Sequence, residues 1–174
     1  MTAPTQAQPG APGPTAVDAA EATFRRILVP IDFSSAARAA FALAMRFADR
    51  WSSEVVLFYA AGADENDEFL QYTGVPWGRD DEEGEGREHL GRFAEAVVPG
   101  SRSRVSMEAK RADDAVEAVL EACARHRPSM VVLGTHARRR RPILRTRAER
   151  LVQSLRCPVV LVRGEPEAPV DPDM

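Results

Sequence analysis

Hydrophobic and polar positions alternate along the chain in blocks typical of a parallel α/β protein. Continuous apolar runs occupy residues 27–31, 54–60, 130–135 and 157–163, as expected for strands that are covered on both faces. Residues 104–110 alternate between apolar and polar positions instead, which predicts a more exposed strand. Five strands are therefore expected.

Between these runs, apolar residues recur at the spacing of amphipathic helices. The four stretches with this spacing are residues 36–50, 87–98, 116–123 and 148–155. Ser34 is a suitable N-cap for the first of these helices, and either Asp113 or Asp114 is suitable for the third. Strands that alternate with helices predict an α/β fold with a mostly parallel sheet. Right-handed crossovers would then place helices on both faces of the sheet.

The ends of the chain and one internal stretch interrupt this rhythm. Residues 1–22 and 164–174 have few large apolar side chains, so we expect disordered tails around one domain at 23–163. The stretch 62–86 holds nine acidic residues and one arginine. A solvated acidic loop is one interpretation, and a lid or docking segment that uses Tyr72 and Trp77 is the other.

Composition excludes several classes of protein. The 174 residues suffice for one domain with a core, and the net charge of −3 does not indicate a general polyanion binder. No apolar stretch approaches the roughly 18 residues that cross a membrane, and the N-terminus does not resemble a secretory signal, so we expect a cytoplasmic protein. Cys123 and Cys157 are expected to be buried free thiols.

An arginine-rich stretch, GTHARRRRPILRTRAER, begins with the last two residues of the fourth predicted strand. Residues 136–147 contain six arginines and no acidic residue, so the local field is strongly positive. Such a loop could hold a phosphate, contact nucleic acid or an acidic partner, or be only a solvated turn. A further alternative is that it faces the acidic stretch 62–86, because both segments leave the carboxyl ends of predicted strands.

Three segments of the chain resemble the universal stress protein family. They are residues 27–60 with Asp32 after the first strand, the VVLGTHA segment, and RAERLVQSLRCPVVLVR before the C-terminal tail. The resemblance implies an open five-stranded parallel sheet of the Rossmann-like, adenine-nucleotide α-hydrolase-like type. It also implies a homodimer that pairs the last strand across a two-fold axis. The residues that this pairing would involve are Pro158, Val159, Val160, Leu161 and Val162.

Many members of this family bind ATP through a loop of the form Gly-x-x-Gly, nine residues, then Gly-Ser/Thr. In such a loop, glycines let backbone N–H groups approach the phosphates. Only Gly134 is retained here: the second position is Ala137, and the later pair is Arg147-Ala148 or, in the register we prefer, Arg145-Thr146. The candidate nucleotide-binding residues are Pro30, Ile31, Asp32, Ala112, Gly134, His136, Ala137, Arg138, Arg145 and Thr146.

The sequence therefore favours a dimeric regulatory stress-response module that does not bind ATP in the ordinary way and needs no cofactor. One alternative is a nucleotide binder, for ATP with Mg²⁺, in which arginine side chains replace the loop glycines. Another is contact of the arginine loop with nucleic acid or an acidic partner, which we consider less well supported because no aromatic residue interleaves with the arginines. His89, His126 and His136 lack metal-ligand spacing, and we expect no enzymatic turnover, with slow ATP hydrolysis left open.

Overall fold

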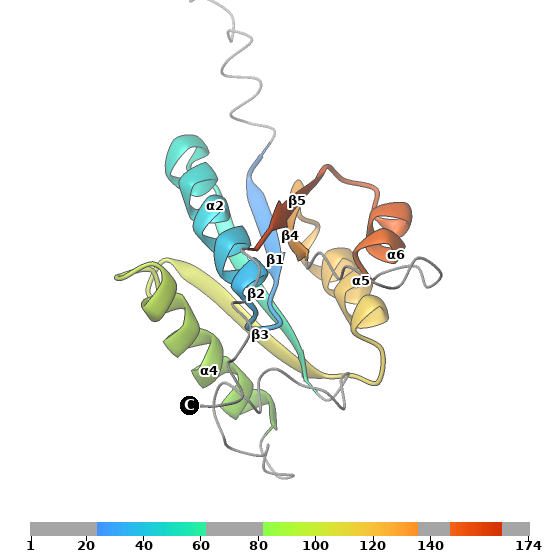
Figure 1. The fold of residues 1–174 in the computed structure, drawn as a ribbon, viewed down its shortest axis with the longest axis horizontal. Coiled ribbons are helices and arrows are strands. Elements are labelled where there is room, and N and C mark those ends of the chain that lie inside the picture. The colour runs from blue at the N-terminus through green and yellow to red at the C-terminus, as the bar shows by residue number, and fades with distance from the viewer. Residues whose placement is uncertain (1–23, 62–81, 136–146, 165–174) are drawn as a thin grey trace, which may run out of the picture.

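The computed structural model describes residues 24–61, 82–135 and 147–164, and these form a sheet flanked by helices (Figure 1). The strands are β1 (Arg26–Pro30), β2 (Glu54–Ala61), β3 (Val105–Arg111), β4 (Met130–Thr135) and β5 (Val159–Arg163). The helices are α2 (Ser35–Trp51), α4 (Glu82–Val97), α5 (Ala115–His126) and α6 (Arg147–Ser154).

All strand pairs are parallel, and the strand order is β3-β2-β1-β4-β5. Strand β1 is central, because Ile27 pairs with Val55 of β2 on one side and with Met130 of β4 on the other. The chain therefore builds the sheet outward from β1 to β3 and then crosses to β4 on the opposite side. This arrangement confirms the predicted open five-stranded parallel sheet.

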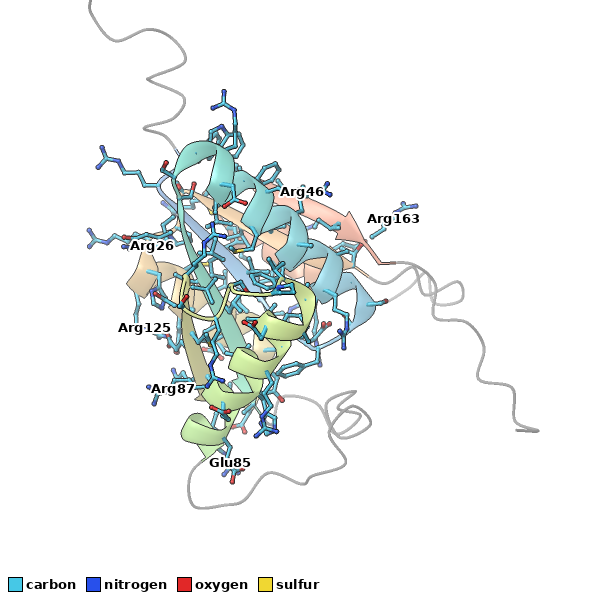
Figure 2. The ribbon with its side chains drawn as sticks, turned by 90° about the vertical axis from the view of Figure 1, so that its left-hand side faces the viewer. Arg26, Arg46, Glu85, Arg87, Arg125 and Arg163 are labelled. Atoms are coloured by element: carbon cyan, nitrogen blue, oxygen red, sulfur yellow. The ribbon has the colours of Figure 1, made fainter. Side chains whose placement is uncertain are left out.

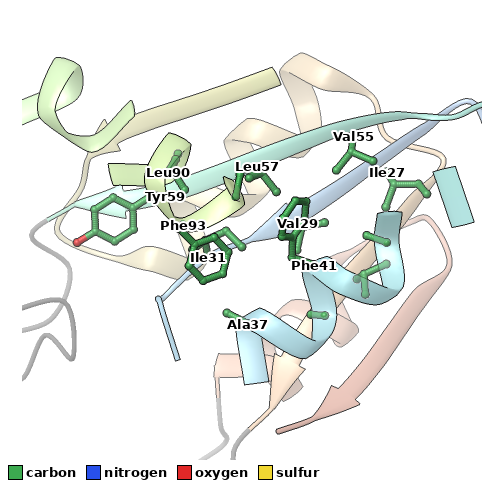
Figure 3. Close-up of a cluster of buried hydrophobic side chains, with 14 of the residues drawn as sticks. Ile27, Val29, Ile31, Ala37, Phe41, Val55, Leu57, Tyr59, Leu90 and Phe93 are labelled. Carbon is green, nitrogen blue, oxygen red and sulfur yellow. The ribbon is translucent and has the colours of Figure 1, made fainter. Parts of the chain in front are cut away.

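Helices cover both faces of the sheet, as predicted. Helices α2 and α4 pack on one face, and α5 lies on the other with α6 packed beside it (Figure 1). Side chains of each strand alternate between the two layers because successive residues point to opposite faces. In β1, Ile27 and Val29 enter the core under α2 and α4, which Figure 3 shows, whereas Leu28 enters the core under α5.

The predicted helix starts are correct where a capping residue marks them. Ser34 caps α2 by accepting a hydrogen bond from the Ala37 N–H, at 3.1 Å. Of the two candidate caps for α5, Asp114 is the one used, and it accepts from the N–H groups of Val116 and Glu117.

Three expectations need correction. Helix α4 begins at Glu82, five residues before the predicted start, so the last part of the acidic stretch 62–86 is helical. Strand β5 begins at Val159, which leaves Pro158 outside the strand. The thiols of Cys123 and Cys157 are free but only partly buried. They lie at the margin of the α5 core, where neighbouring elements cover them incompletely.

Gly164, the first residue of the predicted tail 164–174, is described, and its Cα lies close against the start of α2. The rest of that tail, the predicted tail 1–22, residues 62–81 with Tyr72 and Trp77, and the arginine-rich residues 136–146 lie outside the described residues. No helix within the described part of the chain is long and apolar enough to cross a membrane. Charged side chains lie on the outside of the domain, where Arg46, Arg87 and Arg163 project away from the ribbon (Figure 2).

Candidate functional site

A pocket of about 120 Å³ lies at the carboxyl ends of β1, β2 and β4. This is the point where the strand order reverses, which is where ligands bind in open parallel α/β sheets. The first turns of α5 and α6 complete the wall. The lining residues are Pro30, Ile31, Asp32, Phe58, Tyr59, Ala60, Ala115, Val116, Val119, Leu133, Gly134, Arg147, Ala148 and Leu151.

The floor of the pocket is apolar because it is continuous with the smaller of the two cores. Phe58 of β2, Leu133 of β4 and Leu151 of α6 belong both to that core and to the lining. All three are at most 5% exposed, so the floor is closely packed. A flat apolar group can therefore lie on this floor without displacing a polar partner.

The loop between β1 and α2 supplies the carboxylate of the pocket. Asp32 is exposed, and its Oδ1 accepts hydrogen bonds from the N–H of Ser34, at 3.1 Å, and from the Ser34 hydroxyl, at 2.5 Å. The Ser34 hydroxyl in turn accepts from the Ala37 N–H. The orientation of Asp32 is thus tied to the cap of α2, and the carboxylate is a fixed hydrogen-bond acceptor at the pocket.

A guanidinium group lies on the other wall of the pocket. Arg147 is the first residue of α6, and it lines the pocket with an exposed side chain. Three residues further along α6, Arg150 donates a hydrogen bond to Asp114 at the start of α5, at 3.0 Å. This hydrogen bond from Arg150 holds the pKa of the Asp114 carboxyl below its usual range. Arg150 thus lies against the N-terminus of α5, while Arg147 lines the pocket.

Gly134 lines the pocket, but its lack of a side chain has a separate structural reason. A Cβ atom at this position would lie 2.6 Å from the carbonyl carbon of Ala36 and 2.7 Å from the nitrogen of Ala37. The first turn of α2 therefore packs directly on the backbone of β4. Because this contact alone requires glycine, Gly134 is not by itself evidence for a phosphate-binding loop.

The structure brings together some of the residues that the sequence predicted for the site. Pro30, Ile31, Asp32 and Gly134 line the pocket. Ala112 does not: it follows β3, its N–H donates to the carbonyl of Ala61, and its side chain packs on the α5 core. The remaining five predicted residues, His136, Ala137, Arg138, Arg145 and Thr146, lie outside the described residues.

Sequence reasoning missed the rest of the lining. The end of β2, with Phe58, Tyr59 and Ala60, follows from the rule that neighbouring parallel strands end at one edge, so this signal was available. Arg147 was named only in the less favoured register of the loop. The structure places Arg147 and Ala148 at the pocket, with Arg147 opening α6. Among the described residues, no group of three or more His, Cys, Asp or Glu side chains could hold a metal ion.

Solved structures similar to this chain share its fold. A universal stress protein, UspA, from Lactobacillus plantarum has a TM-score of 0.58 and 21% sequence identity, covering 80% of this chain and 98% of its own. A protein of the universal stress protein family from Burkholderia pseudomallei has a TM-score of 0.51 and 23% identity, covering 80% and 96%. The universal stress protein from Archaeoglobus fulgidus in complex with dAMP has a TM-score of 0.52 and 14% identity, covering 80% and 98%.

Comparison with curated proteins gives no significant match. At these identities the structural likeness establishes the fold, which is the adenine-nucleotide α-hydrolase-like fold. The sequence itself is more specific, because the model of the universal stress protein family matches residues 23–163, most of the chain. The parallel sheet, and the pocket where its strand order reverses, agree with this match. The chain therefore belongs to the universal stress protein family.

Proposed function

We propose that this protein is a non-catalytic, dimeric stress-response module whose pocket takes a nucleoside monophosphate through side-chain contacts and binds ATP weakly. The observation that carries this proposal is the pairing of an apolar floor with two charged groups, Asp32 and Arg147, on the walls of one pocket. An apolar floor suits a purine ring, a carboxylate accepts hydrogen bonds from ribose hydroxyls, and a guanidinium binds phosphate oxygens.

The size of the pocket favours a small ligand. Sites for drug-sized molecules enclose about 300–1,000 Å³, whereas this pocket has about 120 Å³. It can therefore enclose a base, while the sugar and the phosphate extend toward the rim where Arg147 lies. The complex of the Archaeoglobus fulgidus protein with dAMP supports this class of ligand.

The residues of the loop oppose the ordinary mode of ATP binding. Backbone amides can surround a triphosphate only where glycines allow a close approach. Here Gly134 is committed to the contact with α2, and Ala137 stands at the second glycine position. The third glycine position is an arginine in either register, Arg145 or Arg147. Arginine side chains must then supply the donors, and each charge-assisted hydrogen bond contributes about 1.5–3 kcal/mol.

Calorimetry with AMP and with ATP plus Mg²⁺ tests the proposal. We expect AMP to bind at least as tightly as ATP, and Arg147→Ala to weaken AMP binding by about tenfold to a hundredfold, the equivalent of one charge-assisted hydrogen bond. Arg156→Ala is the matched control, because Arg156 is another exposed arginine, shortly after the end of α6, and does not line the pocket. Low-micromolar binding of ATP by the unchanged protein would contradict the proposal.

A second pair of variants separates the two explanations of weak ATP binding. If the missing glycines limit affinity, the double change Ala137→Gly with Arg145→Gly strengthens ATP binding. If arginines hold the phosphate, the same change is neutral or harmful, and Arg138→Ala with Arg145→Ala removes the remaining affinity. Our proposal predicts the second result.

The two edges of the sheet favour dimer formation through β5. Val160 and Val162 pack on the core under α2, while Leu161 points away from it and is 52% exposed. The opposite edge, β3, carries Glu108 and Lys110 in ion pairs with α5, and such charges discourage edge pairing. We infer that β5 pairs with β5 of a second copy, which would cover Leu161 through closed two-fold symmetry.

A further inference from the structure

The turn between β1 and α2 contains a backbone conformation that its residue disfavours. Among the described residues, three other than glycine have positive φ: Phe33 at 61°, Ser52 at 53° and Arg127 at 48°. Ser52 and Arg127 are the C-caps of α2 and α5, where the left-handed conformation is common. Phe33 is not at the C-terminus of a helix, since it lies between β1 and α2. A bulky residue in this conformation carries strain that the surroundings must hold in place.

The ring of Phe33 shows what holds the strained backbone. It is 4% exposed and meets two other rings edge to face: Tyr59 of β2, with centroids 4.9 Å apart, and Phe93 of α4, with centroids 5.5 Å apart. Tyr59 and Phe93 both belong to the core under α2 and α4 (Figure 3). The turn is therefore anchored to α4, an element that does not line the pocket.

The strained residue lies between two residues that share hydrogen bonds. Asp32 precedes Phe33 and Ser34 follows it, and the Asp32 carboxylate accepts from both the N–H and the hydroxyl of Ser34. The left-handed turn at Phe33 brings these groups together. If the ring left its place between Tyr59 and Phe93, the backbone would relax and the carboxylate would lose its fixed direction.

We propose that Phe33 is a positioning residue, which, through its contact with Phe93, fixes the Asp32 carboxylate for ribose hydroxyls. This inference rests on the proposed function for its ligand, but the fixed turn can be tested without one. If Phe33 has this role, α4 affects the ligand affinity of the pocket, although it contributes no lining residue. A role in the core alone predicts lower stability but no change in selectivity between ligands.

Two matched core variants test the anchor by amide hydrogen exchange. Phe93 and Phe41 are both buried and in contact, with ring centroids 6.0 Å apart, but only Phe93 is in ring contact with Phe33. We expect Phe93→Leu to speed exchange at the N–H groups of Ser34 and Ala37 more than Phe41→Leu does, once both are compared at equal global stability. Equal exchange in the two variants would overturn the inference, whatever the ligand.

The ligand arm uses AMP and its 2′,3′-dideoxy analogue, which lacks the hydroxyls that Asp32 would bind. We expect Phe93→Leu to lower AMP affinity by about tenfold, the lower range for a hydrogen bond to a charged group, and to leave the dideoxy analogue unchanged. Phe33→Gly should act in the same direction, although glycine tolerates the positive φ. An equal loss of affinity for both ligands would overturn the inference and leave Phe33 with a role in the core only. If the unchanged protein binds neither ligand, the proposed function fails and the exchange arm alone decides the inference.

Discussion

Gly134→Ala should destabilise the protein, because the added methyl group would meet backbone atoms of α2. The new Cβ would lie 2.6 and 2.8 Å from the carbonyl carbon and oxygen of Ala36, and 2.7 Å from the nitrogen of Ala37. These are backbone atoms of a buried helix turn, so no side chain can rotate away and α2 or β4 must shift. Overpacking of this kind costs about 1–3 kcal/mol, and we expect about 2–3 kcal/mol because both elements are part of the core.

The size of this effect is readily measured. For a domain of this length, each kcal/mol lowers Tm by about 2–4 °C, so Gly134→Ala should lower Tm by about 4–12 °C. Urea unfolding followed by far-ultraviolet circular dichroism gives the free energy of unfolding, and an unchanged m-value would show that two-state behaviour is kept.

Gly91→Ala is the control for this prediction. The Cβ of a residue at Gly91 in α4 would meet the guanidinium of Arg102, 2.9 Å away, which is the movable end of a flexible side chain. Alanine also favours the helix over glycine by about 0.5–1 kcal/mol. We expect this variant to be neutral or slightly stabilised. A Gly134→Ala protein within about 0.5 kcal/mol of the unchanged protein would refute the packing argument, since surface substitutions have effects of that size.

Three further predictions follow from other parts of the molecule. Burial raises the pKa of Cys123 to about 12 and also raises the pKa of Cys157, so both thiols should react slowly with iodoacetamide at neutral pH and rapidly in urea. Burial alone would raise the pKa of Glu108, but hydrogen bonds from α5 lower it below its usual 4.5. Its ionised form therefore stabilises the fold above that pH, so Glu108→Gln should cost about 1 kcal/mol at pH 7, with the difference vanishing as pH falls through the lowered pKa. Light scattering should give a dimer at micromolar concentration for the unchanged protein and a monomer for Leu161→Glu; a wild-type monomer would contradict the β5 interface.

Local signals in the sequence were sufficient for most of the fold. Ser34 and Asp114 each precede an apolar helical pattern, and each is the observed N-cap. The start of α4 was missed because residues 82–86 contain glycines and glutamates without apolar periodicity. An acidic first turn suits the positive end of the helix dipole, which is a weaker signal than hydrophobic spacing.

The site could be predicted only in part, because its residues look like core residues in sequence. Phe58 and Leu151 follow the apolar spacing of a strand and a helix. Only the fold shows that they also line a pocket. The contact that explains Gly134 joins β4 to α2, and no local pattern encodes such a distant pair. Arg147 differs from its neighbouring arginines only in being the first residue of α6, a boundary that sequence patterns place imprecisely.

The central place of β1 has a consequence for how the protein folds on the ribosome. Strand β1 pairs with β2, which follows it closely in the sequence, and with β4, which does not. The N–H of Arg26 in β1, for example, donates a hydrogen bond to the hydroxyl of Ser129, 103 residues later. At about 5–20 residues per second, synthesis leaves the β4 side of β1 unpaired for about 5–20 s after β1 emerges. During this interval the β4 side of β1, whose central residues are fully buried in the folded domain, is exposed to solvent. Nascent chains that end between β3 and β4 should therefore be the ones most strongly bound by chaperones.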